Sequence, residues 1–549
     1  MAAPGHGAPG HGAPTAGSLT AGAVASPDIY GALAAQQVLR QGGNAIDAAV
    51  ATGFALAVTY PEAGNLGGGG FMTVYMDGRP YFLDYRETAP AAATAGMYLT
   101  ASGEPDPTLS LVGNLAVGVP GSVAGLAEAH HRFGRLTWKQ DLAPAIALAR
   151  DGFVVTPQLM GILDGSRGNL AKSTNFEAWA KGLKAGRRFR QPQLAVTLQR
   201  IADRGADGFY RGPVADQIVA QMARGPIKGL ITHADLEGYK AVWREPVQGD
   251  WHGFTLITAP PPSSGGIALM QMLAMKADVA SLFQGVALNS PQYIHLLAEI
   301  EKRVFADRAV YLGDPDFIKV PAAALTDPAY IAGRARQIDP AKRSPTAGVT
   351  PGLEKPQTTH FSVVDRWGNA VSNTYTLNGW FGSGVAVEGA GFLLNDEMDD
   401  FSAKPGAPNQ FGVVGGSANA IAPGKRPLSS MTPTILLKDG RVTMVIGTPG
   451  GSRIFTSVFQ VLANAYDFHL PLKAAVGAPR YHHQLLPPDT IFAEPYGPYP
   501  PALAEGLKAR GYTLQSQDFN GDIEAIEVDG RTPTVAPDPR ARGAGLVIR

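Results

Sequence analysis

The 549-residue sequence contains no cysteine. This absence excludes thiol catalysis, disulfide bonds and cysteine-based zinc sites in one step. It leaves the compartment open, because a cysteine-free protein is compatible with both reducing and oxidising surroundings. Acyl transfer by this chain would therefore need a nucleophile other than a thiol.

An excess of charge of either sign is also missing. Lys plus Arg and Asp plus Glu both number 46, so the sequence implies no strongly basic face and argues against nucleic acid as the main partner. No run of about 18 apolar residues occurs, so we expect no transmembrane helix and no membrane insertion. Met1 is followed by a Gly/His/Pro-rich segment without an apolar core, and no signal peptide is visible.

Familiar catalytic signatures are likewise absent. The sequence has no H-E-x-x-H zinc motif, no G-x-S-x-G nucleophile elbow and no Walker A motif. Four glycines occur at 67–70, but the Lys-Ser/Thr of a phosphate loop does not follow them. Taken alone, these glycines favour a tight crossing of backbones over a nucleotide site.

Over most of its length the chain shows helical and strand patterns. Hydrophobic residues make up 45% and charged residues 17%, which is typical of a packed globular protein. Residues 1–20 carry a tandem GHGAP repeat and are expected to form a flexible tail, in which His6 and His11 could bind a metal only weakly. Residues 340–357 are polar and Pro-rich and are expected to form a linker.

Helical periodicity predicts a helix that begins after Asp28 and a second, largely buried helix that begins at Asn44. Helices are also predicted in YIHLLAEIEKRVFADRAVYL and from Thr456 and Ala502 onwards. PPPSSGG at 260–266 is expected to form a loop or turn.

Strand patterns predict three hairpins, with turns at Asp77-Gly78, between Asp365 and Asn369, and at Asp439-Gly440. Strands therefore cluster behind Thr358, with helices on either side in sequence. This arrangement suits sheets covered by helices.

Thr358 lies at the boundary between the linker and the first of these later strands. A threonine that opens a strand is usually structural, because β-branched residues suit strands. A threonine hydroxyl can nevertheless become a nucleophile if a base is close by. Cleavage of the Gln357–Thr358 bond would free an α-amine with a pKa of about 7.7–8.0, so that one residue would carry both nucleophile and base.

The segment QTTHFSVVD at 357–365 resembles the autocleavage site of γ-glutamyltransferases, which are N-terminal nucleophile (Ntn) hydrolases. The resemblance extends over about residues 20–545, because further blocks of that family follow in the same order. They are YRETAP at 85–90, PPPSSGG at 260–266, NDEMDDF at 395–401, KRPLSSMTPT at 425–434, GTPGGSRI at 447–454, APRYHHQ at 478–484 and DPR at 538–540.

This resemblance implies an α/β (α+β) fold, a four-layer αββα sandwich, and self-cleavage into a large subunit (21–357, after the tail) and a small subunit (358–549) that together form one intertwined unit. It implies hydrolysis of γ-glutamyl amides such as glutathione, with transfer to water, amino acids or peptides. Neither a metal nor a cofactor is implied.

The resemblance also assigns roles to particular residues. Thr358 matches the nucleophile and Thr376 the residue that hydrogen-bonds it, while Gly450 and Gly451 match the oxyanion hole. The residues that match ligands of the substrate's α-carboxylate and α-amine are Arg86, Asn378, Glu397, Asp400, Ser429 and Ser430. Without the family match, Thr376 would be taken as an ordinary strand residue, the acidic residues as a solvated turn and the serines as a polar turn.

Two positions depart from the family pattern. Phe411 stands where many bacterial members have a lid tyrosine, and the bulky Trp380 follows the substrate ligand Asn378. Both put the balance between hydrolysis and transpeptidation in doubt.

Two rival functions stay open at this point: a glutaryl- or cephalosporin-type acylase on the same scaffold, and a non-catalytic binding homologue. The compartment is expected to be periplasmic or extracellular by resemblance to exported bacterial relatives.

Overall fold

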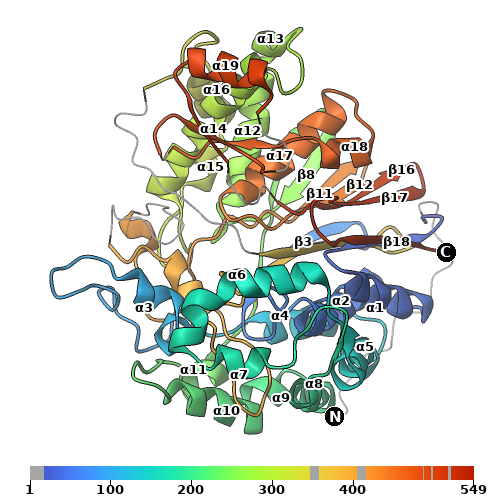
Figure 1. Cartoon of the computed structure of the whole chain (residues 1–549). Helices are drawn as coiled ribbons and strands as arrows, with labels where there is room; N and C mark the ends of the chain where they lie inside the picture. Colours follow the sequence, from blue (N-terminus) through green and yellow to red (C-terminus); the bar gives the residue numbers. More distant parts are fainter. Residues whose placement is uncertain (1–17, 346–357, 405–415, 486, 496–498, 517–520) are drawn as a thin grey trace, which may run out of the picture.

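The computed structural model describes residues 18–345, 358–404, 416–485, 487–495, 499–516 and 521–549. Two β-sheets lie face to face at the centre, and helices cover the outer face of each (Figure 1). The layers follow the order helix, sheet, sheet, helix. The αββα sandwich expected from the sequence is therefore confirmed.

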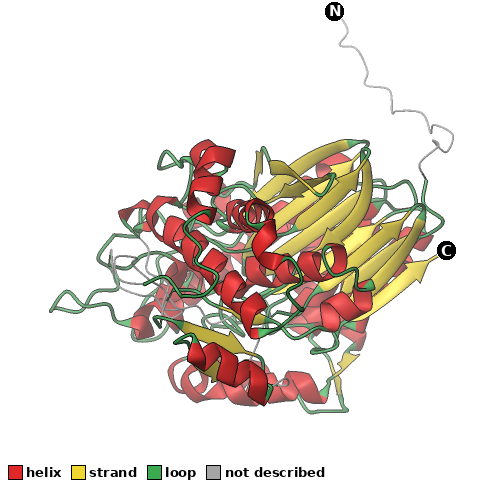
Figure 2. Ribbon diagram, turned by 90° about the horizontal axis from the view of Figure 1, so that it is seen from above, coloured by secondary structure: helices red, strands yellow, loops and turns green. Residues whose placement is uncertain are grey.

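The first sheet has seven antiparallel strands in the order β18-β1-β9-β10-β2-β3-β6. Its centre is the hairpin of β9 (Thr359–Val364) and β10 (Ala370–Thr376). The chain ends beside β18, at the edge of this sheet (Figure 2). The remaining strands are β1 (Gly22–Ser26), β2 (Gly69–Met76), β3 (Arg79–Tyr85), β6 (Val242–Arg244) and β18 (Ala544–Ile548).

The second sheet has six antiparallel strands in the order β17-β16-β12-β11-β8-β7. They are β7 (Val247–Trp251), β8 (Phe254–Thr258), β11 (Thr434–Lys438), β12 (Arg441–Ile446), β16 (Glu524–Asp529) and β17 (Thr532–Pro537). Two small sheets complete the strands: β4 (Phe153–Val154) with β5 (Arg188–Phe189), and β13 (Tyr481–His482), β14 (Thr490–Ala493) and β15 (Thr513–Ser516).

Mostly aliphatic side chains fill the space between the two large sheets. Val364 and Ala370 of the first sheet and Ile435, Val445 and Ile526 of the second belong to one buried cluster. Both sheets contain strands from before and after Thr358, so residues on either side of that position contribute to each layer.

One helical layer packs on the seven-stranded sheet. Its long members are α1 (Ile29–Arg40), α2 (Ala45–Thr59), α4 (Ser122–Phe133), α5 (Trp138–Asp151) and α8 (Pro192–Arg204). The other layer packs on the six-stranded sheet and contains α12 (Gly265–Asp278), α14 (Pro291–Tyr311), α17 (Arg453–Tyr466) and α18 (Leu472–Gly477).

Shorter or more peripheral helices surround these layers. They are α3 (Pro107–Leu111), α6 (Pro157–Ser173), α7 (Phe176–Ala180), α9 (Asp207–Tyr210), α10 (Pro213–Met222), α11 (His233–Gly238), α13 (Ala280–Phe283), α15 (Ala322–Leu325), α16 (Pro328–Ala335), α19 (Pro501–Ala509), and the 3₁₀ helices η1 (Asn114–Ala116), η2 (Glu397–Asp400) and η3 (Ser417–Asn419). No helix among the described residues is long and apolar enough to cross a membrane.

Most predicted elements occur where the sequence places them. Asp28 caps α1 and Asn44 caps α2, and every residue of α2 is buried, as its nearly all-round apolar pattern indicates. The three predicted hairpins form with the predicted turns.

Three boundaries differ from the prediction. Gly265 already opens α12, although the Ser264 side chain makes no capping hydrogen bond, and α17 begins at Arg453 instead of Thr456. Leu19 is buried and bonds to the backbone of Arg366 at 2.8 Å, so the expected tail does not extend to residue 20.

Candidate active site

Thr358 lies directly before the central strand β9 and is only 5% exposed. The antiparallel register pairs Thr359 of β9 with Tyr375 of β10. One step further along the same register, Thr376 stands opposite Thr358. Directly opposed residues of antiparallel strands have Cα atoms about 4.5–5.5 Å apart, so the two threonine side chains are neighbours.

Thr376 is held from several sides. Its hydroxyl accepts a hydrogen bond from the Asn378 amide (2.7 Å), and its carbonyl accepts one from the Asn65 side chain (2.8 Å). A Cβ added to Gly68 would overlap the Thr376 carbonyl oxygen. The glycines at 67–70 thus allow two backbone segments to pass close to each other, as predicted from the sequence. The Gly68 backbone passes Thr376, the neighbour of the candidate nucleophile Thr358.

Although His360 follows the candidate nucleophile Thr358 closely in sequence, its ring is fully buried in the protein interior. Burial lowers its pKa to about 3, and its two ring nitrogens lie 2.8 Å and 3.1 Å from the hydroxyls of Thr374 and Ser362. His360 is therefore neutral and occupied, which leaves the role of base to another group.

Arg86, Glu397 and Asp400 come together in a buried group that also contains Glu87. The Arg86 guanidinium pairs with both Glu397 and Asp400, and it lies 3.7 Å from Glu87. We call these four residues the carboxylate cluster. Three carboxyl groups thus surround one guanidinium.

Burial is the main influence on the acids of this cluster. It raises the pKa of Glu87 to about 8, against the opposing charge of Arg86, and it also raises the pKa of Glu397 and Asp400. Among the described residues, neither oxygen of Glu87 has a hydrogen-bond partner. The cluster therefore has unused capacity for a cationic group.

Asn378 connects this cluster to the threonine pair. Its backbone has a φ of +74°, a left-handed conformation that asparagine tolerates better than most residues. Its side-chain amide donates to the carbonyl of Asp396 (3.0 Å), the residue before Glu397. Trp380 is only partly buried in this same loop, whereas Phe411 lies outside the described residues.

Ser429 and Ser430 lie against the PPPSSGG block. The hydroxyl and amide of Ser264 both donate to the Ser429 carbonyl, at 2.8 Å and 2.7 Å. Arg308 of α14 donates to the hydroxyls of Ser264 (2.9 Å) and Ser430 (3.0 Å). Sequence reasoning missed Arg308 and Ser264 as site residues, although the PPPSSGG block was a usable signal for Ser264.

Gly450 and Gly451 lie in the loop between β12 and the amino end of α17. Their φ angles are +145° and +56°, which suit glycine. Among the described residues, neither of their amides has a hydrogen-bond partner. The loop starts at Gly447, which lies close to the His360 ring. Gly447 is therefore beside strand β9, near Thr358. Two unused amides near a helix amino end suit a developing negative charge.

A family model described as Gamma-glutamyltranspeptidase matches residues 31–548. The chain belongs to this family. Among its relatives, a glutathione hydrolase proenzyme of Pseudomonas aeruginosa is 63% identical over 527 residues, which cover 96% of this chain and 94% of that protein.

Two solved structures extend the family comparison. A cephalosporin acylase from Bacillus halodurans is 27% identical, with a TM-score of 0.82 over 100% of this chain and 99% of that chain. A gamma-glutamyltranspeptidase from Pseudomonas nitroreducens, complexed with L-DON, is 56% identical, with a TM-score of 0.59 over 61% of this chain and 98% of that chain. The gamma-glutamyltranspeptidase fold thus also serves acylases.

Proposed function

We propose that the chain is a precursor that cleaves its own Gln357–Thr358 bond and then acts as a γ-glutamyltransferase. It hydrolyses γ-glutamyl amides such as glutathione and transfers the γ-glutamyl group to water, amino acids or peptides. The observation that supports this proposal is the buried position of Thr358 directly before β9, where extending the β9–β10 register by one residue brings it opposite Thr376.

In the first reaction the Thr358 hydroxyl attacks the carbonyl carbon of Gln357. The peptide bond breaks as an ester forms, and water then hydrolyses the ester. This leaves a carboxylate on Gln357 and a free amine on Thr358. The products are the large subunit, 21–357 behind its tail, and the small subunit 358–549, which stay together because both sheets contain strands of each.

In the second reaction the new amine accepts the proton of the Thr358 hydroxyl, which attacks the γ-carbonyl of the donor. The Gly450 and Gly451 amides stabilise the oxyanion, and one such donor is typically worth about 2.7–4 kcal/mol. The amine then protonates the leaving group, and a γ-glutamyl ester remains on Thr358. Water or an acceptor amine attacks this ester and releases the product.

The carboxylate cluster supports the proposal of a glutamyl donor. An α-ammonium group donates three hydrogen bonds, which Glu397, Asp400 and Asn378 would accept. The substrate's α-carboxylate would pair with Arg86 and the hydroxyls of Ser429 and Ser430. Binding thus exchanges ion pairs within the protein for ion pairs with the substrate.

N-terminal sequencing of the smaller fragment tests the processing step. We expect a fragment that begins at Thr358 and carries a γ-glutamyl adduct there when the reaction is quenched early. Thr358→Ala should remain one uncut band and lose activity about 1,000-fold or more. The adjacent Thr359→Ala is the matched control and should be cut normally. A new terminus at any other residue would refute the proposal, and an uncut but folded wild type would favour a non-catalytic homologue.

A glutaryl-type acylase is the second candidate, because the cephalosporin acylase from Bacillus halodurans shares the fold. A glutaryl group lacks the α-amine, so its carboxylate would compete for Arg86 without supplying an ammonium group to Glu397 and Asp400. Rates on γ-glutamyl-p-nitroanilide and glutaryl-p-nitroanilide separate the two functions. Faster cleavage of the glutaryl compound would favour the acylase.

The remaining parts of the proposal concern location and acceptors. We place the enzyme in the periplasm or outside the cell, by similarity to exported bacterial relatives. Trp380 and Phe411 are the positions at which we expect acceptor preference to be set.

A further inference from the structure

A second group of buried acids lies in the helical layer, away from the residues assigned above. Asp47 of α2, His130 of α4 and Asp141 of α5 each offer one ligand atom, and these atoms all lie within 4.8 Å of one another. The two aspartates are fully buried, and the His130 side chain is 16% exposed. Three different helices therefore meet at one point.

The two aspartates differ in how their oxygens are used. Asp47 accepts hydrogen bonds from the amides of Asn44 (2.7 Å), Arg135 (2.9 Å) and Leu136 (3.2 Å). No N–H or O–H group of the described residues donates a hydrogen bond to either oxygen of Asp141. A buried carboxylate without a donor costs free energy, so Asp141 needs either a proton shared with Asp47 or a cation.

No lysine or arginine of the described residues forms an ion pair with Asp47 or Asp141. Two solutions remain for such a carboxylate pair: a shared proton or a bound cation. Burial, together with the charge of Asp47, raises the pKa of Asp141 to about 9, so a proton occupies the pair at neutral pH when no cation is present.

The position of His130 favours the cation. Its Nε2 lies 3.6 Å from Asp141 Oδ2 and 3.0 Å from the carbonyl oxygen of Leu136. In the tautomer protonated on Nε2, this nitrogen donates to the Leu136 carbonyl oxygen; in the tautomer protonated on Nδ1, the Nε2 lone pair faces the two carboxylates, and the Leu136 oxygen lies 3.0 Å from Nε2. Imidazole and carboxylate together are the ligand set of first-row divalent ions.

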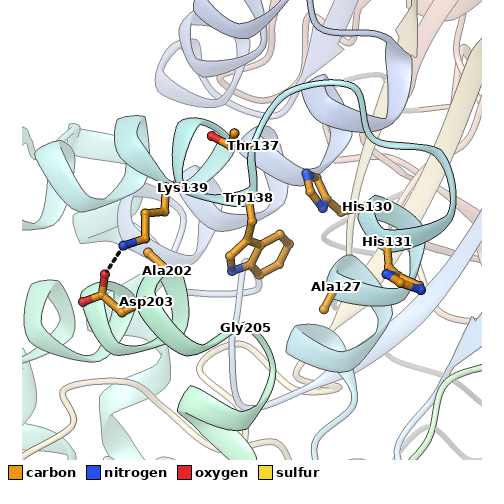
Figure 3. Close-up of a pocket in the computed structure, with 9 residues that line it drawn as sticks. All are labelled: Ala127, His130, His131, Thr137, Trp138, Lys139, Ala202, Asp203 and Gly205. Atoms are coloured by element: carbon orange, nitrogen blue, oxygen red, sulfur yellow. Dashed lines mark hydrogen bonds and ion pairs between the residues drawn. The ribbon is translucent and has the colours of Figure 1, made fainter. Parts of the chain in front are cut away.

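Of the three residues, His130 also faces a cavity. His130 lines a cavity of about 530 Å³, together with His131, Thr137 and Trp138 (Figure 3). The ring centroids of His130 and Trp138 lie 5.2 Å apart in an edge-to-face arrangement. This contact restrains the orientation of the imidazole.

We propose that Asp47, His130 and Asp141 bind one divalent transition-metal ion, Zn²⁺ or Mn²⁺, with the Leu136 carbonyl as a fourth ligand. The ion joins α2, α4 and α5 and stabilises the helical layer over the seven-stranded sheet. This site takes no part in catalysis, so it stands or falls independently of the γ-glutamyl chemistry.

Metal binding is tested on chelator-treated full-length protein in a His6→Gln/His11→Gln background, which removes the histidines of the amino-terminal tail. We expect one equivalent of Zn²⁺ or Mn²⁺ by calorimetry and elemental analysis, and a Tm increase of about 2–4 °C at saturation. Asp141→Asn should weaken binding at least about 100-fold while hydrolysis of γ-glutamyl-p-nitroanilide is unchanged.

His131→Gln is the matched control, because His131 lines the same cavity but does not belong to the three-residue group. It should bind the ion as the parent does. The proposal is overturned if the parent binds no stoichiometric metal, if Asp141→Asn binds it equally well, or if His131→Gln abolishes binding. The first of these outcomes would assign the pair to a shared proton.

Discussion

Helix α14 contains most of one buried charged group and lies beside a second, and the two groups are built in opposite ways. Near its middle, Glu299 accepts hydrogen bonds from Lys302 (3.1 Å), Arg303 (2.9 Å) and the Ser344 amide (3.0 Å). We call these four residues the α14 ion cluster. Nine residues further on, Arg308 reaches the candidate substrate serines beside the carboxylate cluster.

The two groups of acids respond to burial differently. Burial raises the pKa of Glu299, but Lys302, Ser344 and Arg303 together outweigh it, and the net pKa is lowered. In the carboxylate cluster one guanidinium serves three acids, and burial prevails. Buried acids whose charge is balanced by cations of the protein indicate a structural role. Buried acids with too few cationic partners indicate a binding site for a charged ligand.

Arginine-to-lysine substitutions test this contrast most strongly. Arg86→Lys should lower kcat/KM for γ-glutamyl-p-nitroanilide about 100- to 1,000-fold, because lysine cannot reproduce the two-pronged geometry around a carboxylate. Arg303→Lys, the matched change in the α14 ion cluster, should leave kcat/KM within about twofold and lower Tm instead. Equal losses of activity in both variants would remove the distinction between the clusters.

Glutamate-to-glutamine substitutions should separate the clusters by stability. Glu299→Gln removes the acid of Arg303 and one of the two acids of Lys302, which also pairs with Asp489 at 3.3 Å, and should lower the free energy of unfolding by about 3 kcal/mol. Glu397→Gln removes one member of an overcrowded group and should leave that free energy unchanged or increase it. Urea unfolding of both variants measures the difference, and a comparable loss in Glu397→Gln would show that its charge is already balanced.

Arg308 is expected to position Ser430 rather than to contact the reacting atoms. Arg308→Met should raise KM about 10-fold with a smaller change in kcat, because a misplaced hydroxyl weakens binding of the α-carboxylate. Arg308→Lys should recover part of the loss. Steady-state kinetics of both variants test whether Arg308 positions Ser430. A normal KM together with a lower yield of folded protein would show that Arg308 has only a structural role.

The smallest expected effect concerns pH. The folded-state pKa of Glu87 is about 8, above its usual 4.5, so between these values the folded protein holds a proton that the unfolded chain has lost. Stability should therefore decrease as pH rises through this window. Glu87→Gln should show a flatter decrease in Tm between pH 5 and 8, and identical slopes would contradict the assignment.

Local sequence patterns predicted the parts of the fold that depend on local chemistry. α2 could be predicted because Asn44 caps a long apolar run, and the β9–β10 hairpin because its turn and alternation are short-range signals. The pairing of β1 with β18 places Gly22 opposite Ile548. No local sequence pattern predicts this pairing. Such contacts depend on tertiary packing that no single window of sequence contains.

The candidate site shows the same limit. The family resemblance predicted that Arg86, Glu397 and Asp400 share a site, and the structure brings them together. It did not predict Arg308, whose helical pattern resembles that of any amphipathic segment. It also could not show that Asp47 and Asp141 face each other, because that depends on how two helices cross.

The mixed origin of the two sheets has a consequence for the mature molecule. Separating the fragments that scission before Thr358 would produce would strip neighbours from β18, β1, β9, β10 and β2 in one sheet and from β8 and β11 in the other. Such a cut would therefore leave one cooperative folded unit. Halves expressed separately would each present unpaired strand edges and should aggregate, so folding would have to be complete before cleavage.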